Sequence, residues 1–264
     1  MSLDLPSMLC FRITRACNAH CGFCLAPPDG HHPDAEILGH RLDWLLDRGV
    51  RVLHFCGGEP TLHPALPRLL ARAHGRGAKA RLTTNAIAIS DPLVDALRDA
   101  CCQVKISLHG DRAHHDALVG RQAFDSTTGN LRRLLAAGVP TSVQTTVVTG
   151  GAWVVGWVAD LCLAAGVRRL SVLPFIPRGK GSERREEFGL PAQERRALRE
   201  LVRGTRRTLA GSLDVRWLDF TARSYHVVEA DGRIVLERAT ETMDEVLARI
   251  PDPPGRPLTP AGRR

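Results

Sequence analysis

The sequence predicts an α/β fold, a partial (β/α)6 barrel with a C-terminal β-hairpin and helix extension. The first observation is a repeat in which an amphipathic run, a glycine and an apolar strand follow one another. Its glycines are Gly49, Gly77, Gly138 and Gly166. The first two and the last two lie 28 residues apart, and the gap of 61 residues between the pairs holds two further units. We expect each glycine to end a helix in the left-handed conformation.

The second observation completes the set of strands. A helical pattern over residues 91–100, followed by QVKISL, supplies the unit missing from the central gap, and MLCFRIT, starting at Met8, adds a first strand. Six strands then alternate with helices, which predicts a parallel sheet with right-handed crossovers. The sheet is either an open doubly wound sheet or a curved partial barrel. In both, ligands gather at the carboxyl ends of the strands.

The third observation is a change of pattern in the C-terminal part. YHVVEADGRIVLER reads as a hairpin that turns at residues 230–232. We expect a short helix over 241–250 and a proline-rich, disordered tail after it. The predicted domains are a barrel at 1–210, a hairpin and helix extension at 211–250, and the tail at 251–264.

Composition argues against a nucleic-acid or membrane protein. The formal charge is +8 at pH 7, but only three of the 36 basic residues are lysines, Lys79, Lys105 and Lys180. Replacement of lysine by arginine can follow from the base composition of a coding sequence, so the charge is weak evidence for nucleic acid. The chain has no run of 18 apolar residues and no secretory signal pattern at its start. We therefore expect a cytoplasmic protein without a membrane partner, with its eight cysteines reduced.

The predicted strands end in unusual residues. RACNAHCGFC follows the first strand, CGGEPT the second, TTNA the third, SLHGD the fourth and PFIPRGKG the sixth. One rim of the sheet thus collects cysteines, a carboxylate, hydroxyls and a basic loop. A purely structural parallel sheet does not need these residues on one edge, so we expect a functional site there.

Three cysteines, Cys17, Cys21 and Cys24, fall within eight positions of the first loop. A structural zinc site needs four tetrahedral ligands, and the later chain offers no second Cys-x-x-Cys pair. His20 would be strained as a fourth ligand because it lies beside Cys21. Three thiolates instead suit one [4Fe–4S] cluster in which one iron has no protein ligand. A zinc knuckle or a set of redox cysteines is the alternative.

These motifs resemble those of the radical S-adenosylmethionine (SAM) enzymes. The family's loop is Cys-x-x-x-Cys-x-aromatic-Cys, matched by the three cysteines and Phe23. Its second strand ends in Gly-Gly-Glu-Pro, matched by residues 57–60. Either motif alone is moderate evidence, whereas both, in order on consecutive strands, are strong. The resemblance covers roughly residues 8–180.

The resemblance implies that the open iron chelates SAM, that an electron cleaves its sulfur–C5′ bond, and that the 5′-deoxyadenosyl radical abstracts hydrogen from a substrate. Glu59 would accept a hydrogen bond from the SAM ammonium, and Gly57 and Gly58 would let the backbone approach closely. Phe23 would shield the cluster, and Ser107 would bond ribose or carboxylate. The predicted cofactor-binding residues are Phe23, Gly57, Gly58, Glu59, Asn85, Ser107 and Arg178. No catalytic residue is assigned.

Other polar residues near the motifs have plainer interpretations. For Asn85 the alternative is a turn residue, and for Arg178 it is a plain surface loop. We expect His109, His114 and His115 to lie in a solvated loop, with substrate contact as the alternative. The cysteines expected to be small core residues are Cys10, Cys56, Cys101, Cys102 and Cys162.

We expect a single-cluster radical SAM enzyme that acts on a peptide or small metabolite in a specialised biosynthetic pathway. The alternatives are a nucleotide- or RNA-modifying radical SAM enzyme, an activase that installs a glycyl radical, and a zinc-binding interaction module without catalysis. No cysteine follows Cys162, so the extension lacks the further clusters of many peptide-modifying relatives. Electrons would come from an external flavodoxin- or ferredoxin-type donor. A peptide would bind the barrel mouth directly or through a separate substrate-recognition protein.

Overall fold

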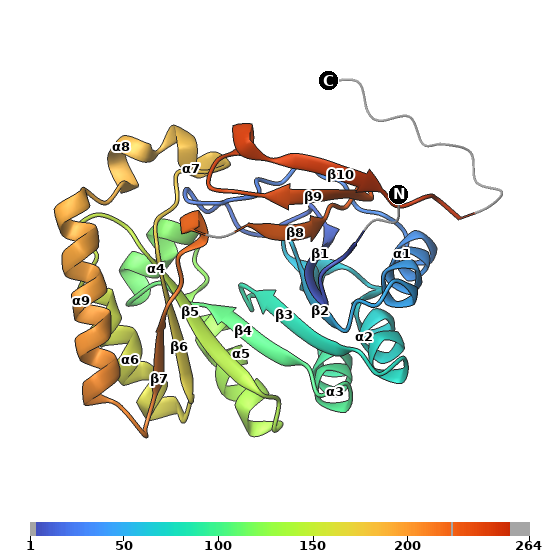
Figure 1. Cartoon of the computed structure of the whole chain (residues 1–264). Helices are drawn as coiled ribbons and strands as arrows, with labels where there is room; N and C mark the ends of the chain where they lie inside the picture. Colours follow the sequence, from blue (N-terminus) through green and yellow to red (C-terminus); the bar gives the residue numbers. More distant parts are fainter. Residues whose placement is uncertain (1–3, 223, 254–264) are drawn as a thin grey trace.

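Seven parallel strands lie side by side in the order of the sequence (Figure 1). The structure is a computed structural model that describes residues 4–222 and 224–253. The strands are β1 (Met8–Thr14), β2 (Val52–Gly57), β3 (Lys79–Thr84), β4 (Gln103–Ser107), β5 (Thr141–Val147), β6 (Arg169–Pro174) and β7 (Asp214–Trp217). The six predicted strands are confirmed, and β7 extends the sheet beyond β6.

Helices occupy the connections and cover the outer face of the curved sheet (Figure 1). They are α1 (Ala35–Asp47), α2 (Leu66–Gly75), α3 (Asp91–Asp99), α4 (Arg112–Val119), α5 (Phe124–Ala136), α6 (Val154–Ala165), α7 (Lys180–Glu183), α8 (Arg185–Phe188) and α9 (Ala192–Thr208). The four repeat glycines have φ between 73° and 88° and follow helix ends, as predicted. The start of α1 is capped by Asp34, whose carboxylate accepts from the backbone N–H groups of Glu36 and Ile37 at 3.0 and 2.9 Å.

The hydrophobic core lies between the sheet and these helices. Alternate strand residues point toward the helices, so Phe11, Phe55 and Ile106 are fully buried between sheet and helices. Leu42 of α1 and Leu70 of α2 complete the same core from the helical side. This packing fixes which face of each strand turns inward.

The inner, concave face of the strands is polar. Lys105 and Ser107 of β4 and Gln144 of β5 alternate with buried neighbours and are themselves half-buried. A closed (β/α)8 barrel fills its interior with branched apolar side chains. The concave face here is instead lined with hydrogen-bonding and charged groups.

The cysteines predicted to lie in the core divide into two groups. Cys102 and Cys162 are buried, as predicted. Cys101 is exposed, and Cys10 and Cys56 are only half-buried on the concave face, so the prediction is wrong for these three. The reason for the last two is the strand alternation that sends their neighbours outward.

The C-terminal extension continues the same sheet beyond β1. Its strands are β8 (Tyr225–Val228), β9 (Arg233–Glu237) and β10 (Glu245–Arg249). Strand β8 pairs in parallel with β1, and the β8–β9 and β9–β10 pairs are antiparallel. The turn predicted at 230–232 is confirmed, and Figure 1 shows the three strands crossing the top of the arch formed by the others.

The prediction of a helix over 241–250 is wrong. A single 3-10 turn at Glu241–Met243 is followed by β10, in which Val246 lies opposite Val235 of β9. Pairing with a neighbouring strand thus outweighs the local helical pattern. The division between barrel and extension stays a prediction, and residues 254–264 of the predicted tail lie outside the described residues. In the described part of the chain, no helix combines the length and apolar character needed to cross a membrane.

Candidate functional site

The cysteine loop, residues 15–34, connects β1 to α1 and rests on the end of α4. The backbone N–H of His20 donates to the carbonyl of Val119 at 2.9 Å. Gly120, next in the chain, has φ of 73°, and a Cβ there would lie 3.0 Å from the His20 carbonyl oxygen. A glycine is therefore needed where the loop meets the helix.

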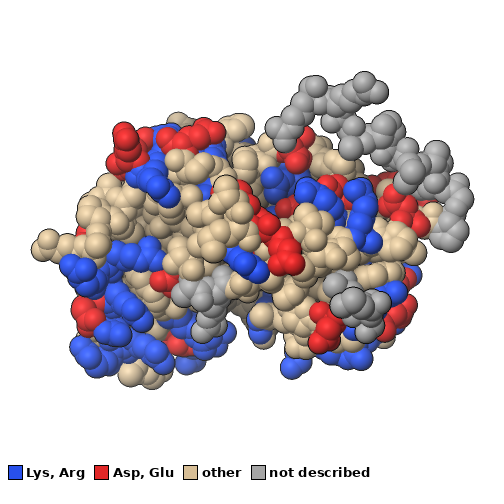
Figure 2. Space-filling model, turned by 45° about the horizontal axis from the view of Figure 1, so that its top comes forward, with Lys and Arg blue, Asp and Glu red and all other residues tan. Residues whose placement is uncertain are grey.

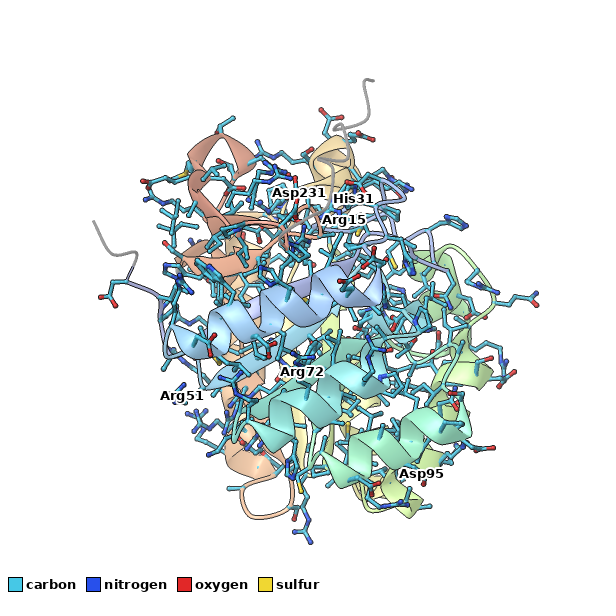
Figure 3. The ribbon with its side chains drawn as sticks, turned by 90° about the vertical axis from the view of Figure 1, so that its right-hand side faces the viewer. Arg15, His31, Arg51, Arg72, Asp95 and Asp231 are labelled. Atoms are coloured by element: carbon cyan, nitrogen blue, oxygen red, sulfur yellow. The ribbon has the colours of Figure 1, made fainter. Side chains whose placement is uncertain are left out.

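The two ends of the cysteine loop are tied together at its base. The backbone N–H of Arg15 donates to the carbonyl of His31 at 2.7 Å, and the Thr14 hydroxyl lies 2.9 Å from Nδ1 of His32. Figure 3 shows Arg15 and His31 next to each other above α1. The three cysteines thus lie within a loop that is closed by its own hydrogen bonds.

The three loop thiols lie close enough to influence one another. Burial and, after it, the charges of the neighbouring Cys24 and Cys17 together raise the pKa of Cys21 to about 12. Burial also raises the pKa of Cys17 and of Cys24. Three thiolates therefore require a cation that compensates their charge. Within the described residues, no three His, Cys, Asp or Glu side chains converge on a point suited to a single metal ion.

Two glycines let the end of β2 cross close to the end of β1. The N–H of Gly58 donates to the carbonyl of Thr14 at 2.9 Å, and that of Glu59 donates to the carbonyl of Ala16 at 2.8 Å. A Cβ on Gly57 or on Gly58 would lie 2.2 Å from the Thr14 or the Ala16 carbonyl oxygen, respectively. The glycines thus join the two motifs, while their predicted approach to SAM stays a prediction.

Glu59 is 1 % exposed and connects the ends of β2 and β3. Its Oε1 accepts from the N–H and hydroxyl of Thr61 at 3.0 and 2.8 Å and from the hydroxyl of Thr84 at 2.6 Å. Its Oε2 accepts from the Asn85 N–H at 2.7 Å. Burial raises the pKa of Glu59, and these hydrogen bonds oppose that rise. Oε2 can accept one further donor. Contact with the SAM ammonium stays a prediction.

Asn85 links the end of β3 to the cysteine loop. Its Nδ2 donates to Oδ1 of Asn18 at 2.8 Å, and its Oδ1 accepts from the N–H of Ile87 at 3.0 Å. Asn85 therefore acts as a turn residue, which was the alternative interpretation. Its contact with Asn18 of the cysteine loop was not predicted from the sequence. The Ser107 hydroxyl at the end of β4 has no hydrogen-bond partner among the described residues, so it is available to a ligand.

Phe23 packs beneath the cysteine loop. Its apolar neighbours there are Leu118, Val148, Phe175 and Phe188. Its ring also meets that of His109 edge-on, with 4.8 Å between centroids. These contacts anchor the cysteine loop on an apolar cluster, and the predicted shielding of the iron–sulfur cluster and packing against adenine stay predictions.

The prediction of a solvated histidine loop is wrong, because His114 and His115 lie in α4, where His114 is half-buried, and His109 is buried just after β4. His109 and His115 are only 2 % and 1 % exposed, because α4 begins at Arg112 and folds over the end of β4. Nδ1 of His109 accepts from the Thr146 N–H at 3.0 Å, so its neutral ring carries the proton on Nε2. Burial lowers the pKa of His109 well below its ordinary value, and the neighbouring histidines lower it further. The sequence analysis placed His109 in solvent, with substrate contact as the alternative, although its position at the end of a strand was a signal.

Arg178, in the segment between β6 and α7, is 7 % exposed and ion-paired, which differs from a plain surface loop. Its guanidinium bonds the carboxylates of Glu237 and Asp244 in the C-terminal extension. The Arg178 guanidinium, predicted to bind an anion, is thus already paired with carboxylates of this chain. Its contact with the cofactor stays a prediction. Further along the chain, the N–H of Lys180 donates to the Cys24 carbonyl at 3.0 Å, which links the segment after β6 to the cysteine loop.

Arg12 is a buried charge that sequence reasoning missed. It lies on the concave side of β1, bonds Glu237 at 2.7 and 3.0 Å and also bonds Glu229. Arg12 and Arg178 therefore meet on Glu237. The available signal was an arginine inside the otherwise apolar strand MLCFRIT.

Comparison with known proteins identifies the same family. Residues 11–152 match the model described as the Radical SAM superfamily. The chain is 28 % identical over 231 residues to the PqqA peptide cyclase of Streptomyces rochei, covering 85 % of this chain and 63 % of that protein. It is 31 % identical over 220 residues to the mycofactocin maturase MftC of Mycobacterium ulcerans, covering 79 % of this chain and 58 % of that protein.

Solved structures share the fold at lower identity. Streptococcus suis SuiB bound to precursor peptide SuiA superposes with a TM-score of 0.75 at 20 % identity, covering 88 % of this chain and 59 % of SuiB. The chain thus spans about three fifths of the length of these relatives. Because the family model covers more than half of the chain and includes both motifs, the chain belongs to the radical SAM superfamily.

Proposed function

We propose that this chain is a radical SAM enzyme that binds one [4Fe–4S] cluster through Cys17, Cys21 and Cys24 and abstracts hydrogen from a peptide. The observation that carries the proposal is the backbone ladder between the two motifs, in which Gly58 and Glu59 bond the residues directly before the first cysteine. This ladder brings the cysteine loop and the Gly-Gly-Glu-Pro turn to one rim. Members of the superfamily use SAM and an iron–sulfur cluster.

The donor set fits such a cluster. A [4Fe–4S] cluster takes one thiolate on each of three irons, whereas a single ion would need the sulfurs gathered around one point. Cationic iron also offsets the burial and mutual repulsion that raise the pKa of Cys21 and its neighbours. When bound, the cluster and SAM supply a one-electron cleavage that yields the 5′-deoxyadenosyl radical.

The chain's own residues position SAM and exclude water. Glu59 accepts from the SAM ammonium through the remaining capacity of Oε2, which is otherwise bonded only to the Asn85 N–H. The unpartnered Ser107 hydroxyl bonds ribose or carboxylate. Phe23 and the apolar side chains packed around it keep water from the inner side of the loop.

A peptide is the proposed substrate. The PqqA peptide cyclase is named for a peptide, and SuiB was solved with a precursor peptide bound. The polar concave face supports this choice, because peptide backbone and polar side chains need hydrogen-bonding partners when they leave water. Electrons come from an external flavodoxin- or ferredoxin-type donor.

The first test is SAM cleavage by anaerobically reconstituted, dithionite-reduced protein. We expect 5′-deoxyadenosine and methionine from the wild type, and loss of both products in Cys17→Ala, Cys21→Ala and Cys24→Ala. Cys101→Ala is the matched control, because this thiol is exposed and lies outside the site. Full cleavage in any one of the three loop variants would disprove the proposed ligand set.

Iron and sulfide analysis supplies a second, independent test. One cluster predicts about four of each per chain, and the triple alanine variant should fall near zero. A reproducible content near eight would contradict the single cluster. Residual cluster absorbance in the triple variant would contradict the assignment of these cysteines.

A further inference from the structure

The concave face of the barrel carries a positive charge that no carboxylate in the described part of the chain pairs with. Lys105 lies in the middle of β4, between Val104 and Ile106, which are buried against the helices. Its side chain therefore turns to the concave face. Within the described residues, no carboxylate lies within ion-pair distance of its ammonium group.

We propose that Lys105 binds a carboxylate of the substrate peptide, the side chain of an Asp or Glu residue, on the concave face of the barrel. This inference rests on the proposed function, which makes the substrate a peptide. It names the chemistry that the substrate must carry.

The neighbours of Lys105 in the sheet are already satisfied. Thr83 and Ser142 are its register partners on β3 and β5. The Thr83 hydroxyl lies 2.7 Å from Nε2 of His54, and the Ser142 hydroxyl donates to the Val104 carbonyl at 3.1 Å. Lys105 thus differs from Thr83 and Ser142, because its ammonium group has no hydrogen-bond acceptor among the described residues.

The surrounding charges increase the need for an anion. Burial lowers the pKa of Lys105, and Arg81, Arg169 and Arg216 lower it further. These arginines come from β3 on one side of β4 and from β6 and β7 on the other, so positive charge flanks Lys105 in both directions along the sheet. Their influence is balanced only in part, since Asp214 bonds both Arg169 and Arg216, at 3.0 and 2.8 Å.

Cys10 acts on the pKa of Lys105 in the opposite sense and raises it. Its own pKa is lowered, first by a hydrogen bond with Cys56 and also by His54 and Arg12, while burial opposes the change. The Cys10 Sγ lies 4.0 Å from Nδ1 of His54, and in the described part of the chain no hydrogen bond joins it to Lys105. A ligand carboxylate would remain the main counter-charge.

The position of Lys105 suits an anchor for the substrate. Ser107, at the rim where the proposed cofactor site lies, is two residues further along β4, about 7 Å by strand geometry. From there, a polar row continues through Gln144 and Ser171 on the next two strands. A peptide whose acidic side chain reaches Lys105 would therefore hold its neighbouring residues at the rim.

The test uses two acetylated and amidated nonapeptides of alternating Gly and Ala, one with a central Glu and the other with a central Gln. Each carries a fluorophore, and anisotropy reports its affinity for the cluster-loaded holoenzyme with SAM present. We expect the Glu peptide to bind about tenfold more tightly, the effect of one charge-assisted bond. Lys105→Met should abolish the preference, Lys105→Arg should keep it, and Lys79→Met, at an exposed position on β3, should leave it unchanged.

Amine labelling of the wild type gives a direct second readout, because the chain has only three lysines. The Glu peptide should slow modification of Lys105 while Lys79 continues to react. Equal binding of the two peptides, a preference that survives Lys105→Met, or protection of Lys105 by SAM alone would overturn the inference. SAM cleavage without peptide reports the proposed function separately, so a failure there is distinguishable from a failure here.

Discussion

Two regions flank β1, and they are attached to it by different forces. On one side, the β2 turn is joined to the end of β1 and the cysteine loop through backbone hydrogen bonds and two glycines that admit no side chain. On the other side, β8 pairs with only Cys10 and Phe11, and the ion pairs of Arg12 and Arg178 supply further contacts. The first attachment should therefore be sensitive to added volume and the second to lost charge.

Adding volume at the β2 turn should have the largest effect. In Gly58→Ala, the new Cβ would lie 2.2 Å from the Ala16 carbonyl oxygen, so the backbone must move. We expect a loss of about 3 kcal/mol or more in unfolding free energy, measured by urea denaturation of the cluster-free protein. Gly129→Ala is the control, because this glycine is in α5 and has open space around it, and it should gain about 0.5 to 1 kcal/mol. Equal stability of the two variants would contradict the packing argument.

Removing charge on the other side should have the next largest effect. Arg12→Met removes one buried cation shared by Glu229 and Glu237. Glu237 keeps its ion pair with Arg178 at 3.1 Å, and Glu229 keeps a longer one with Arg15 at 3.7 Å. Breaking such a pair costs about 3 to 5 kcal/mol when fully buried, and we expect about 2 to 3 kcal/mol here because some exposure remains. Hydrogen exchange should increase first in β8 to β10. Arg98→Ala, which breaks exposed pairs with Asp95 and Asp99, should change stability by about 0.5 kcal/mol at most.

The same contrast explains what the sequence could reveal. The repeat glycines, the strand alternation and the two motifs act over short distances or by fixed periods, so they predicted six strands and the rim where the motifs meet. Arg12 and Glu237 are 225 residues apart, and no local pattern links them. The strand β10 was missed for the same reason, since its pairing with β9 overrides a helical pattern.

The site was predicted in type more than in detail. The sequence placed Glu59 and Asn85 at strand ends, but it did not reveal their hydrogen-bond partners. Glu59 accepts from Thr61, Thr84 and the N–H of Asn85. The Asn85 side chain donates to Asn18. Such partners depend on rotamers and on the crossing of separate strands. His109 was misplaced because burial beneath α4 is a tertiary property.

Glu59→Gln tests the hydrogen bonds at the β2 turn, and its effect on stability should be smaller than that of the two changes above. An amide cannot accept on both sides, so either the three donors at Oε1 or the Asn85 N–H would face an NH2 group. We expect a loss of about 1.5 to 2 kcal/mol in stability. Isothermal titration of the cluster-loaded variant should also show weaker SAM binding if Oε2 accepts from the ammonium. Unchanged SAM affinity in a folded variant would limit Glu59 to shaping the turn.

The smallest expected effect is the pH dependence of the stability that Asp244 contributes by attaching the C-terminal extension to Arg178. Burial alone would raise the pKa of Asp244, but its hydrogen bonds from Arg178 and the Arg238 N–H, with the charges of Arg178 and Arg12, outweigh burial and lower it. A carboxyl whose pKa is lower in the folded state stabilises the fold fully above its unfolded pKa of about 3.9. That contribution is lost as the pH falls through the folded value.

Asp244→Asn should therefore be less stable than the wild type by about 1 kcal/mol at pH 6, and the difference should shrink as the pH is lowered below 4. Urea denaturation of both proteins at each pH isolates Asp244, because every other group titrates alike in the two. Asp125→Asn is the control: Arg112 lowers the pKa of Asp125 through a hydrogen bond, but water screens that exposed pair, so its change with pH should be smaller. A difference for Asp244→Asn that stays constant with pH would mean that shape, and not charge, secures the extension at Arg178.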